Sequence, residues 1–167
     1  LFGTLRHAPL LRIVAGRDLP TRPATLVDWR CDKAMGGDWP VLVAEPGARA
    51  DGLLIEPDGD TLARLDFYEA VFGYVRAPVT VETQAGPVAA EVWRPTHRDT
   101  GGSEPWAPED WAVRWAPMTL EAAADIIRRR GRQTPQEVGR LAGIIRARAD
   151  AVIRTRAWHR PGAVGAS

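Results

Sequence analysis

The pattern of apolar and polar residues divides this chain into a strand-rich part and a helical part. Before residue 97, short apolar runs are interrupted by glycine and proline, which is typical of strands and turns. We expect strands, the first being only a strand end, at 1–5, 22–33, 40–44, 50–56, 74–83 and 88–93. Helical periodicity occurs at 7–15 and 58–69 and dominates after residue 118. The pattern therefore predicts an α+β fold with a C-terminal helical extension.

Two turns are expected among these strands. Pro46-Gly47 would separate the third and fourth strands, and Ala85-Gly86-Pro87 would join the last two as an antiparallel hairpin. The run Gly52-Leu53-Leu54-Ile55 is continuously apolar, which predicts a strand buried on both faces.

The segment from His97 to Pro117 lacks a clear period and is expected to be a long loop. Loops of this length in compact domains are usually functional or wrapped over the surface. It contains Trp106, Trp111 and Trp115, and three large aromatic rings predict that the loop packs back onto the body.

The C-terminal part is expected to form two helices. Thr119 can cap the first, which would end at Arg130 before Gly131. Thr134-Pro135-Gln136-Glu137 is a capping box with proline at the first helical position, and it would open a helix reaching about Trp158.

The length of 167 residues suits one domain and an extension. We place the domain at 1–117 and a basic helical extension or connector at 118–167, and we expect residues 1–118 to fold without the tail. Residues 1–118 hold 12 Lys and Arg against 17 Asp and Glu, whereas residues 119–167 hold 10 Arg against 4. A basic tail can meet nucleic acid, an anionic surface or its own acidic body. The arginines are scattered without an aromatic stacking pattern, which favours the acidic body over nucleic acid.

Several partners and compartments are excluded by what the sequence lacks. It has no run of 18 apolar residues, so no membrane segment is expected. Cys31 is the single cysteine and cannot form an internal disulfide, which indicates a reducing, cytoplasmic location. His7, His97 and His159 share no ligand spacing, and no phosphate-binding glycine motif is present, so neither a metal nor a cofactor is expected.

The helix around residues 60–70 carries the strongest candidate for chemistry. Leu62, Leu65 and Glu69 fall on one face, and the two leucines mark that face as the buried one. A carboxyl group placed there has a raised pKa and can exchange a proton near neutral pH. The alternative is that Glu69 forms a structural pair with an Arg or Tyr. Asp66 is expected to be a structural hydrogen-bonding partner.

A second candidate is the segment Phe2-Gly3-Thr4-Leu5-Arg6, at a junction between a strand end and a helix. Backbone amides at such a junction lack internal partners, and a glycine lets a ligand approach closely. The segment can therefore cradle a carboxylate or phosphate. The alternative is that the glycine only makes a turn.

An ordered set of motifs gives these candidates a common interpretation. The motifs are Phe2-Gly3-Thr4-Leu5-Arg6, Trp39-Pro40-Val41-Leu42, Gly52-Leu53-Leu54, Leu65-Asp66-Phe67-Tyr68-Glu69, Tyr74-Val75-Arg76 and Val92-Trp93. In this order, over about residues 1–95, the chain resembles the γ-glutamylcyclotransferase-like family, including its AIG2-like members. The resemblance implies a small mixed β-barrel with flanking helices. Phe2 replaces the common Tyr of the first motif, and Trp93 stands where some members have Tyr.

The resemblance also implies a reaction that needs no metal or cofactor. The α-amino group of a γ-glutamyl compound attacks its own γ-carbonyl, which releases an amine and 5-oxoproline. Glu69 matches the family's acid/base glutamate. Gly3, Thr4, Leu5 and Arg6 match the loop that holds the γ-glutamyl end, and Tyr74 and Trp93 match aromatic positions near the pocket.

Two other functions stay open at this point. The chain can be a non-catalytic module that binds a small ligand for a larger protein, such as one with a Nudix hydrolase domain beyond Ser167. It can also be an interaction protein that uses its basic tail. The sequence leaves the leaving amine and the oligomeric state open.

Overall fold

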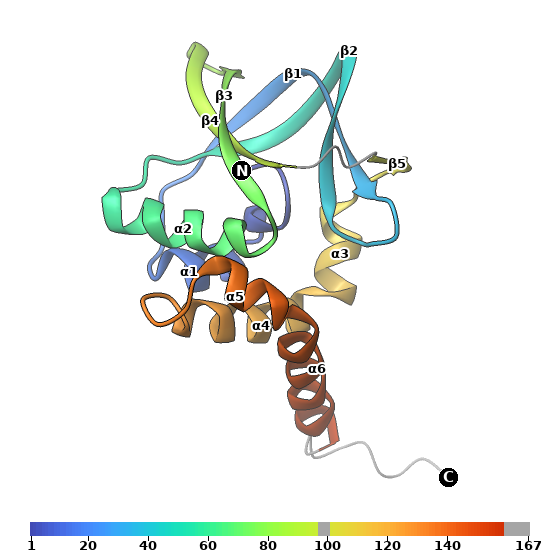
Figure 1. The fold of residues 1–167 in the computed structure, drawn as a ribbon. Coiled ribbons are helices and arrows are strands. Elements are labelled where there is room, and N and C mark those ends of the chain that lie inside the picture. The colour runs from blue at the N-terminus through green and yellow to red at the C-terminus, as the bar shows by residue number, and fades with distance from the viewer. Residues whose placement is uncertain (97–100, 159–167) are drawn as a thin grey trace.

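The computed structural model describes residues 1–96 and 101–158 and has helices packed beneath an antiparallel sheet (Figure 1). The strands are β1 (Arg22–Ala34), β2 (Pro40–Leu54), β3 (Tyr74–Thr83), β4 (Gly86–Pro95) and β5 (Gly101–Pro105). A 3₁₀ turn, η1 (Thr4–Arg6), precedes α1 (Ala8–Ala15) and α2 (Gly59–Val71). The remaining helices are α3 (Pro108–Arg114), α4 (Ala116–Arg128), α5 (Pro135–Arg140) and α6 (Ala142–Trp158). The predicted α+β class with a C-terminal helical extension is confirmed.

The sheet is open rather than closed. Its strands follow the order β2-β1-β3-β4, with β5 added to the far end of β1, and every pairing among the described strands is antiparallel. β1 meets β3 only at Thr25 opposite Glu82, so two long hairpins touch over a short stretch. The prediction of a mixed β-barrel is therefore correct only loosely, because the pairings are antiparallel and the sheet does not close.

The predicted turn at Pro46-Gly47 is wrong, because β2 runs through these residues. The chain does not reverse there; the strand continues through a bulge, where the pairing with β1 shifts between Val27 and Trp29. Gly47 has a φ of 81°, and its amide donates to Asp28 Oδ1 at 2.7 Å. The glycine thus absorbs a kink within one strand. Leu53 and Leu54 are only half-buried, so the prediction of burial on both faces is wrong.

Residues 1–5 do not form the predicted strand end. Leu1 exchanges two hydrogen bonds of 2.7 Å with Leu53 of β2, but the chain turns away at Gly3 into η1. One residue pair is too short to make a strand. The helix expected at 7–15 follows immediately as α1.

The predicted long loop at 97–117 contains regular structure instead. Residues 97–100 lie outside the described part, β5 pairs with β1, and α3 follows it. Trp106 and Trp111 are buried, with ring centroids 6.2 Å apart. The expectation that the tryptophans pack back onto the body is confirmed for Trp106 and Trp111, and their packing explains why residues 101–117 form regular structure without a strong period.

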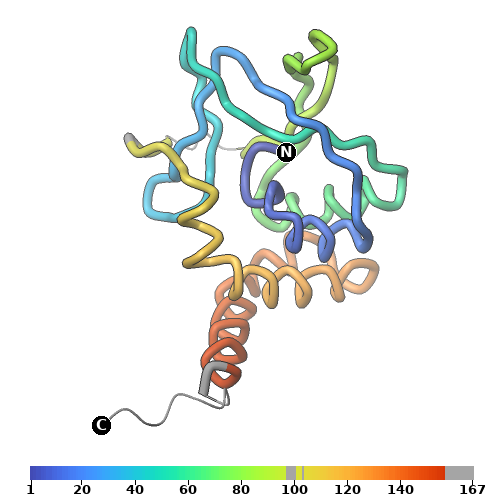
Figure 2. The backbone as a smooth tube through the Cα atoms, turned by 180° about the vertical axis from the view of Figure 1, so that it is seen from behind, coloured from blue at the N-terminus to red at the C-terminus, as the bar shows by residue number. Residues whose placement is uncertain are grey.

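The C-terminal helices begin and end differently from the predictions. α4 starts at Ala116, and Thr119 lies inside it, donating from Oγ1 to the Trp115 carbonyl at 2.8 Å. The capping box of Thr134 and Glu137 is present. The expected single helix to Trp158 is interrupted at Leu141, where α5 ends and α6 turns away from the sheet (Figure 2).

The core is shared by the N-terminal and C-terminal parts. Leu10 of α1 and Leu65 of α2 are fully buried in one cluster with Ala123, Val138 and Ile145 from α4, α5 and α6. Buried side chains therefore do not divide at residue 117. No helix of the described residues is long and apolar enough to cross a membrane.

Candidate active site

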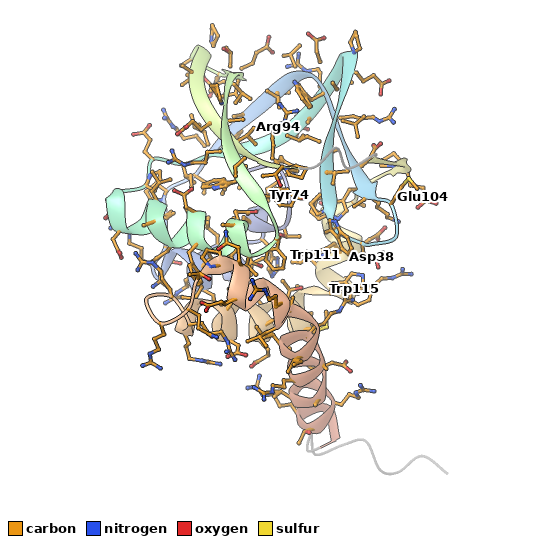
Figure 3. The ribbon with its side chains drawn as sticks, in the orientation of Figure 1. Asp38, Tyr74, Arg94, Glu104, Trp111 and Trp115 are labelled. Carbon is orange, nitrogen blue, oxygen red and sulfur yellow. The ribbon has the colours of Figure 1, made fainter. Side chains whose placement is uncertain are left out.

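A cavity of about 540 Å³ lies between the sheet, α2 and the C-terminal helices. Its lining includes Gly3, Thr4, Leu5, Glu69, Tyr74 and Trp93. Trp111 and Trp115 also line it, and Figure 3 shows them below Tyr74. The cavity thus brings together the predicted carboxyl group and the predicted N-terminal loop, which are more than 60 residues apart in the chain.

Glu69 is held by the last turns of α2. Asp58 caps the helix by accepting a 2.9 Å hydrogen bond from the Thr61 amide. Leu65 and Tyr68 are buried and fix which face of α2 meets the core, and this orients Glu69 along the cavity wall. The predicted inward orientation of Glu69 is therefore seen in the structure.

The carboxyl group of Glu69 has a raised pKa of about 7. Burial is the largest cause, because it disfavours the charged form; the nearby Leu1 amino group opposes the rise and Asp66 adds to it. Within residues 1–96 and 101–158, no Arg side chain forms an ion pair with Glu69. The alternative of a structural pair with Arg is thus not observed there. A carboxyl group with this pKa can gain or lose a proton near neutral pH.

The N-terminal loop approaches the cavity closely at Gly3. A Cβ atom on Gly3 would lie 2.6 Å from Cγ of Pro40, so a side chain there would force the loop away. The turn uses the carbonyls of Gly3 and Thr4, which accept from Arg6 and His7 at 3.0 Å. No hydrogen bond among the described residues uses the amides of Gly3, Thr4 or Leu5. These amides are available to an anionic ligand.

Arg6 lies apart from the other predicted binding residues. It is not among the residues that line the cavity, and its Nη1 donates to the Asp51 carbonyl at 3.1 Å. In the structure Arg6 therefore ties η1 to β2, and a direct contact with substrate stays a prediction.

Tyr74 and Trp93 line the cavity from β3 and β4, as their motifs suggested. Tyr74 donates its hydroxyl to the Pro40 carbonyl at 3.4 Å, and Trp93 Nε1 donates to Asp66 Oδ1 at 2.9 Å. Arg76 Nε donates to the same Asp66 oxygen at 3.0 Å. The expectation that Asp66 is a structural hydrogen-bonding partner is confirmed, because it anchors both β3 and the Trp93 ring to α2.

The described residues contain no group of three His, Cys, Asp or Glu side chains that could hold a metal ion. His7 packs edge-on against Trp111 with ring centroids 5.8 Å apart, while His97 and His159 lie outside the described residues. Cys31 is half-buried, and burial raises the pKa of its thiol to about 12, so it is a poor nucleophile at neutral pH.

The residues that form this cavity can be compared with known protein families. A family model described as gamma-glutamyl cyclotransferase, AIG2-like, matches residues 1–113. The chain belongs to this family. No curated protein matches the chain. Glu69 and the Gly3 loop, which line the same cavity, both lie within the matched part.

Solved structures with the same fold are distant in sequence. A solution structure from Arabidopsis thaliana is 21% identical, with 77% of this chain and 79% of that chain covered and a TM-score of 0.54. A structure titled gamma-glutamyl cyclotransferase is 18% identical, covering 86% and 83% of the two chains with a TM-score of 0.53. An uncharacterized Homo sapiens protein is 19% identical, with the same coverage and a TM-score of 0.51. These likenesses show the cyclotransferase fold.

The part of the cavity lining that comes from α3, α4 and α6 was not predicted from the sequence. Trp111, Trp115, Met118, Ala122, Ile126 and Ile145 belong to it, and all but Trp111 lie beyond the part matched by the cyclotransferase family. The tryptophans were noted as packing residues, but nothing in their spacing pointed to a cavity. The apolar period of 119–130 was the remaining signal, and it is equally typical of a core helix.

Proposed function

We propose that this member of the family is a γ-glutamyl cyclotransferase that releases 5-oxoproline and an amine from a small γ-glutamyl compound. The observation that carries the proposal is the placement of Glu69, with a pKa of about 7, in one cavity with the free amides of Gly3, Thr4 and Leu5. A proton-exchanging group and an anion-binding loop are the two components that this reaction requires.

In the proposed reaction, the Glu69 carboxylate takes a proton from the α-ammonium group of the substrate. The freed amine attacks the γ-carbonyl carbon, which forms the new C–N bond of the five-membered ring. The original amide C–N bond then breaks as protonated Glu69 returns its proton to the departing nitrogen. The ring nitrogen, which still carries an extra proton after the attack, gives that proton through Glu69 to the released amine, which leaves as an ammonium ion. Two protons thus pass from the α-nitrogen to the amine, and Glu69 is restored at the end of each turnover.

The loop would hold the glutamyl end while the ring closes. The amides of Gly3, Thr4 and Leu5 suit the negatively charged or partially negative oxygens of that end. Attack within one molecule gains its rate from being held in the reactive conformation, and no metal is needed to bring two reactants together. Tyr74 and Trp93 would then confine the chain of the substrate between two rings.

The test is product analysis with a panel of γ-glutamyl dipeptides and γ-glutamylamines, using the matching α-glutamyl isomers as controls. Equimolar release of 5-oxoproline and free amine from γ-linked compounds alone is the expected result. Absence of release from every γ-linked compound, with ligands still raising the melting temperature, would favour the non-catalytic binding module instead.

A further inference from the structure

One stripe of a helix makes a largely apolar part of the lining of the cavity that holds Glu69 and the Gly3 loop. Trp115, Met118, Ala122 and Ile126 are spaced by three or four residues and all line the cavity. Residues at this spacing share one helical face, so α4 presents a largely apolar surface to the cavity, with Thr119 as its polar member. Ile145 of α6 lies beside it in the lining and in the core cluster.

The Trp115 ring at the start of this stripe is held by a contact with Arg146. The Arg146 guanidinium lies 5.0 Å from the centroid of the Trp115 ring, within the range of a cation–π interaction. This contact joins α6 to the start of α4 and holds the Trp115 ring against the cavity. The apolar wall is therefore a built surface.

A small polar leaving group would leave this wall facing water. The γ-glutamyl end is compact and polar, and the residues whose amides suit it, Gly3, Thr4 and Leu5, come from the N-terminal loop and not from α4. Cavities of about 300–1,000 Å³ hold drug-sized ligands, and this one, at about 540 Å³, has room beyond the glutamyl group. Apolar side chains predominate in the rest of the lining, beside Thr119 and Arg146, and these apolar side chains gain from being covered by another apolar group.

We propose that the leaving amine of the substrate carries a large apolar group, aromatic or branched aliphatic, which packs on the α4 stripe. This inference rests on the proposed cyclotransferase function and names the substrate class of that site. Burying such a side chain increases kcat/KM by about 10–100-fold over a methyl group at the same position.

The leaving group can be an apolar amino acid, which carries an α-carboxylate, or an apolar amine, which does not. Both would place the same apolar group on the α4 stripe. The test therefore pairs γ-glutamyl-phenylalanine with γ-glutamyl-alanine and γ-glutamyl-phenethylamine with γ-glutamyl-ethylamine. A preference in both pairs supports the inference, and the ratio between the two aromatic compounds tells whether the enzyme favours an amino acid or a simple amine.

A substitution on α4 tests whether the α4 stripe causes the preference for a large apolar leaving group. Ala122→Leu is expected to lower the ratio of kcat/KM for γ-glutamyl-phenylalanine over γ-glutamyl-alanine at least tenfold, because it fills the space for the ring. Ala124→Leu is the matched control, since Ala124 is on the same helix but does not line the cavity, and it should leave the ratio unchanged.

The outcomes separate this inference from the function it rests on. Wild-type kcat/KM values within threefold for the members of both pairs would overturn the inference and leave the cyclotransferase function standing. Absence of release from all four compounds would overturn both. If Ala122→Leu does not fold, the wild-type ratios alone decide.

Discussion

Glu69 illustrates how a single residue connects burial to chemistry. Its pKa is raised from 4.5 to about 7, so the folded protein favours the protonated carboxyl group more than the unfolded chain does. Stability from this group is therefore complete below about pH 4.5 and is lost as pH rises through about 7. The charged form at higher pH costs up to about 3 kcal/mol, less where the cavity admits water.

Glu69→Gln removes this titration and should change the pH dependence of stability. At pH 5 the variant and the wild type are expected to melt at similar temperatures, because both carry a neutral side chain. At pH 8.5 the variant should melt higher, since it has no buried charge to accommodate. Scanning calorimetry at both pH values gives the difference, and an equal difference at both would contradict the raised pKa.

The position of Glu69 was predictable from the sequence because its neighbours on the helix carry the signal. Leu65 is fully buried, and the helical period projects the same face to residue 69. The role of Asp66 was predictable in kind but not in detail, since its partners Arg76 and Trp93 reach it only through the pairing of β3 with β4. The position of Arg6 was not predictable, because its partner, Asp51, is distant in sequence.

At the scale of elements, α5 meets α2 at an unusually close point. A Cβ atom added to Gly139 would lie 2.8 Å from the Val71 carbonyl oxygen, whereas one added to Gly143, on the next helix, would meet no atom within 4 Å. Two glycines in similar sequence contexts therefore have different reasons to be small.

Gly139→Ala and Gly143→Ala form a matched pair that tests this packing. Gly139→Ala is expected to destabilise the protein by about 1–3 kcal/mol through overpacking. Gly143→Ala should be neutral or stabilising by up to about 1 kcal/mol, because alanine is the better helix former. Chemical denaturation measures both, and equal effects would show that α5 does not rest on α2 as described.

Elements with their own local signals were predicted well, and elements fixed by tertiary contacts were not. Asp58 at the start of α2 and the Thr134 capping box place helix starts by themselves. The continuity of β2 depends instead on Asp28 of the neighbouring strand, which binds the Gly47 amide. The break at Leu141 depends on the packing of α5 against α2. Neither dependence is visible in a local window of sequence.

At the scale of the whole molecule, the basic tail is docked on the body and on itself. Arg130 Nη2 lies 2.9 Å from Asp60 Oδ1, and Arg129 pairs with Asp125 and Arg156 with Glu121. Only the Arg130–Asp60 pair joins the tail to the acidic domain, in agreement with that interpretation, and the other two lie within the tail. These pairs are exposed or half-exposed, so the buried apolar contacts contribute more to holding the tail in place.

Deleting residues 118–167 should therefore abolish the cooperative melt, contrary to the expectation from sequence that residues 1–118 fold alone. The deletion removes Ala123, Ile126, Val138 and Ile145 from the core cluster. Each large apolar side chain contributes about 1.5–3 kcal/mol, against a total stability of about 5–15 kcal/mol. A calorimetric scan decides, and a sharp transition near the wild-type temperature would restore the division at residue 117.

The central claim is that Glu69 moves the proton in a γ-glutamyl cyclotransfer, and 5-oxoproline release by Glu69→Gln tests it most directly. We expect the variant to melt cooperatively and to lose at least about 100-fold in kcat relative to the wild type at pH 8. Glu56→Gln, which changes an exposed carboxylate paired with Arg22, should keep wild-type turnover. Turnover by a folded Glu69→Gln variant within tenfold of the wild type would contradict the account.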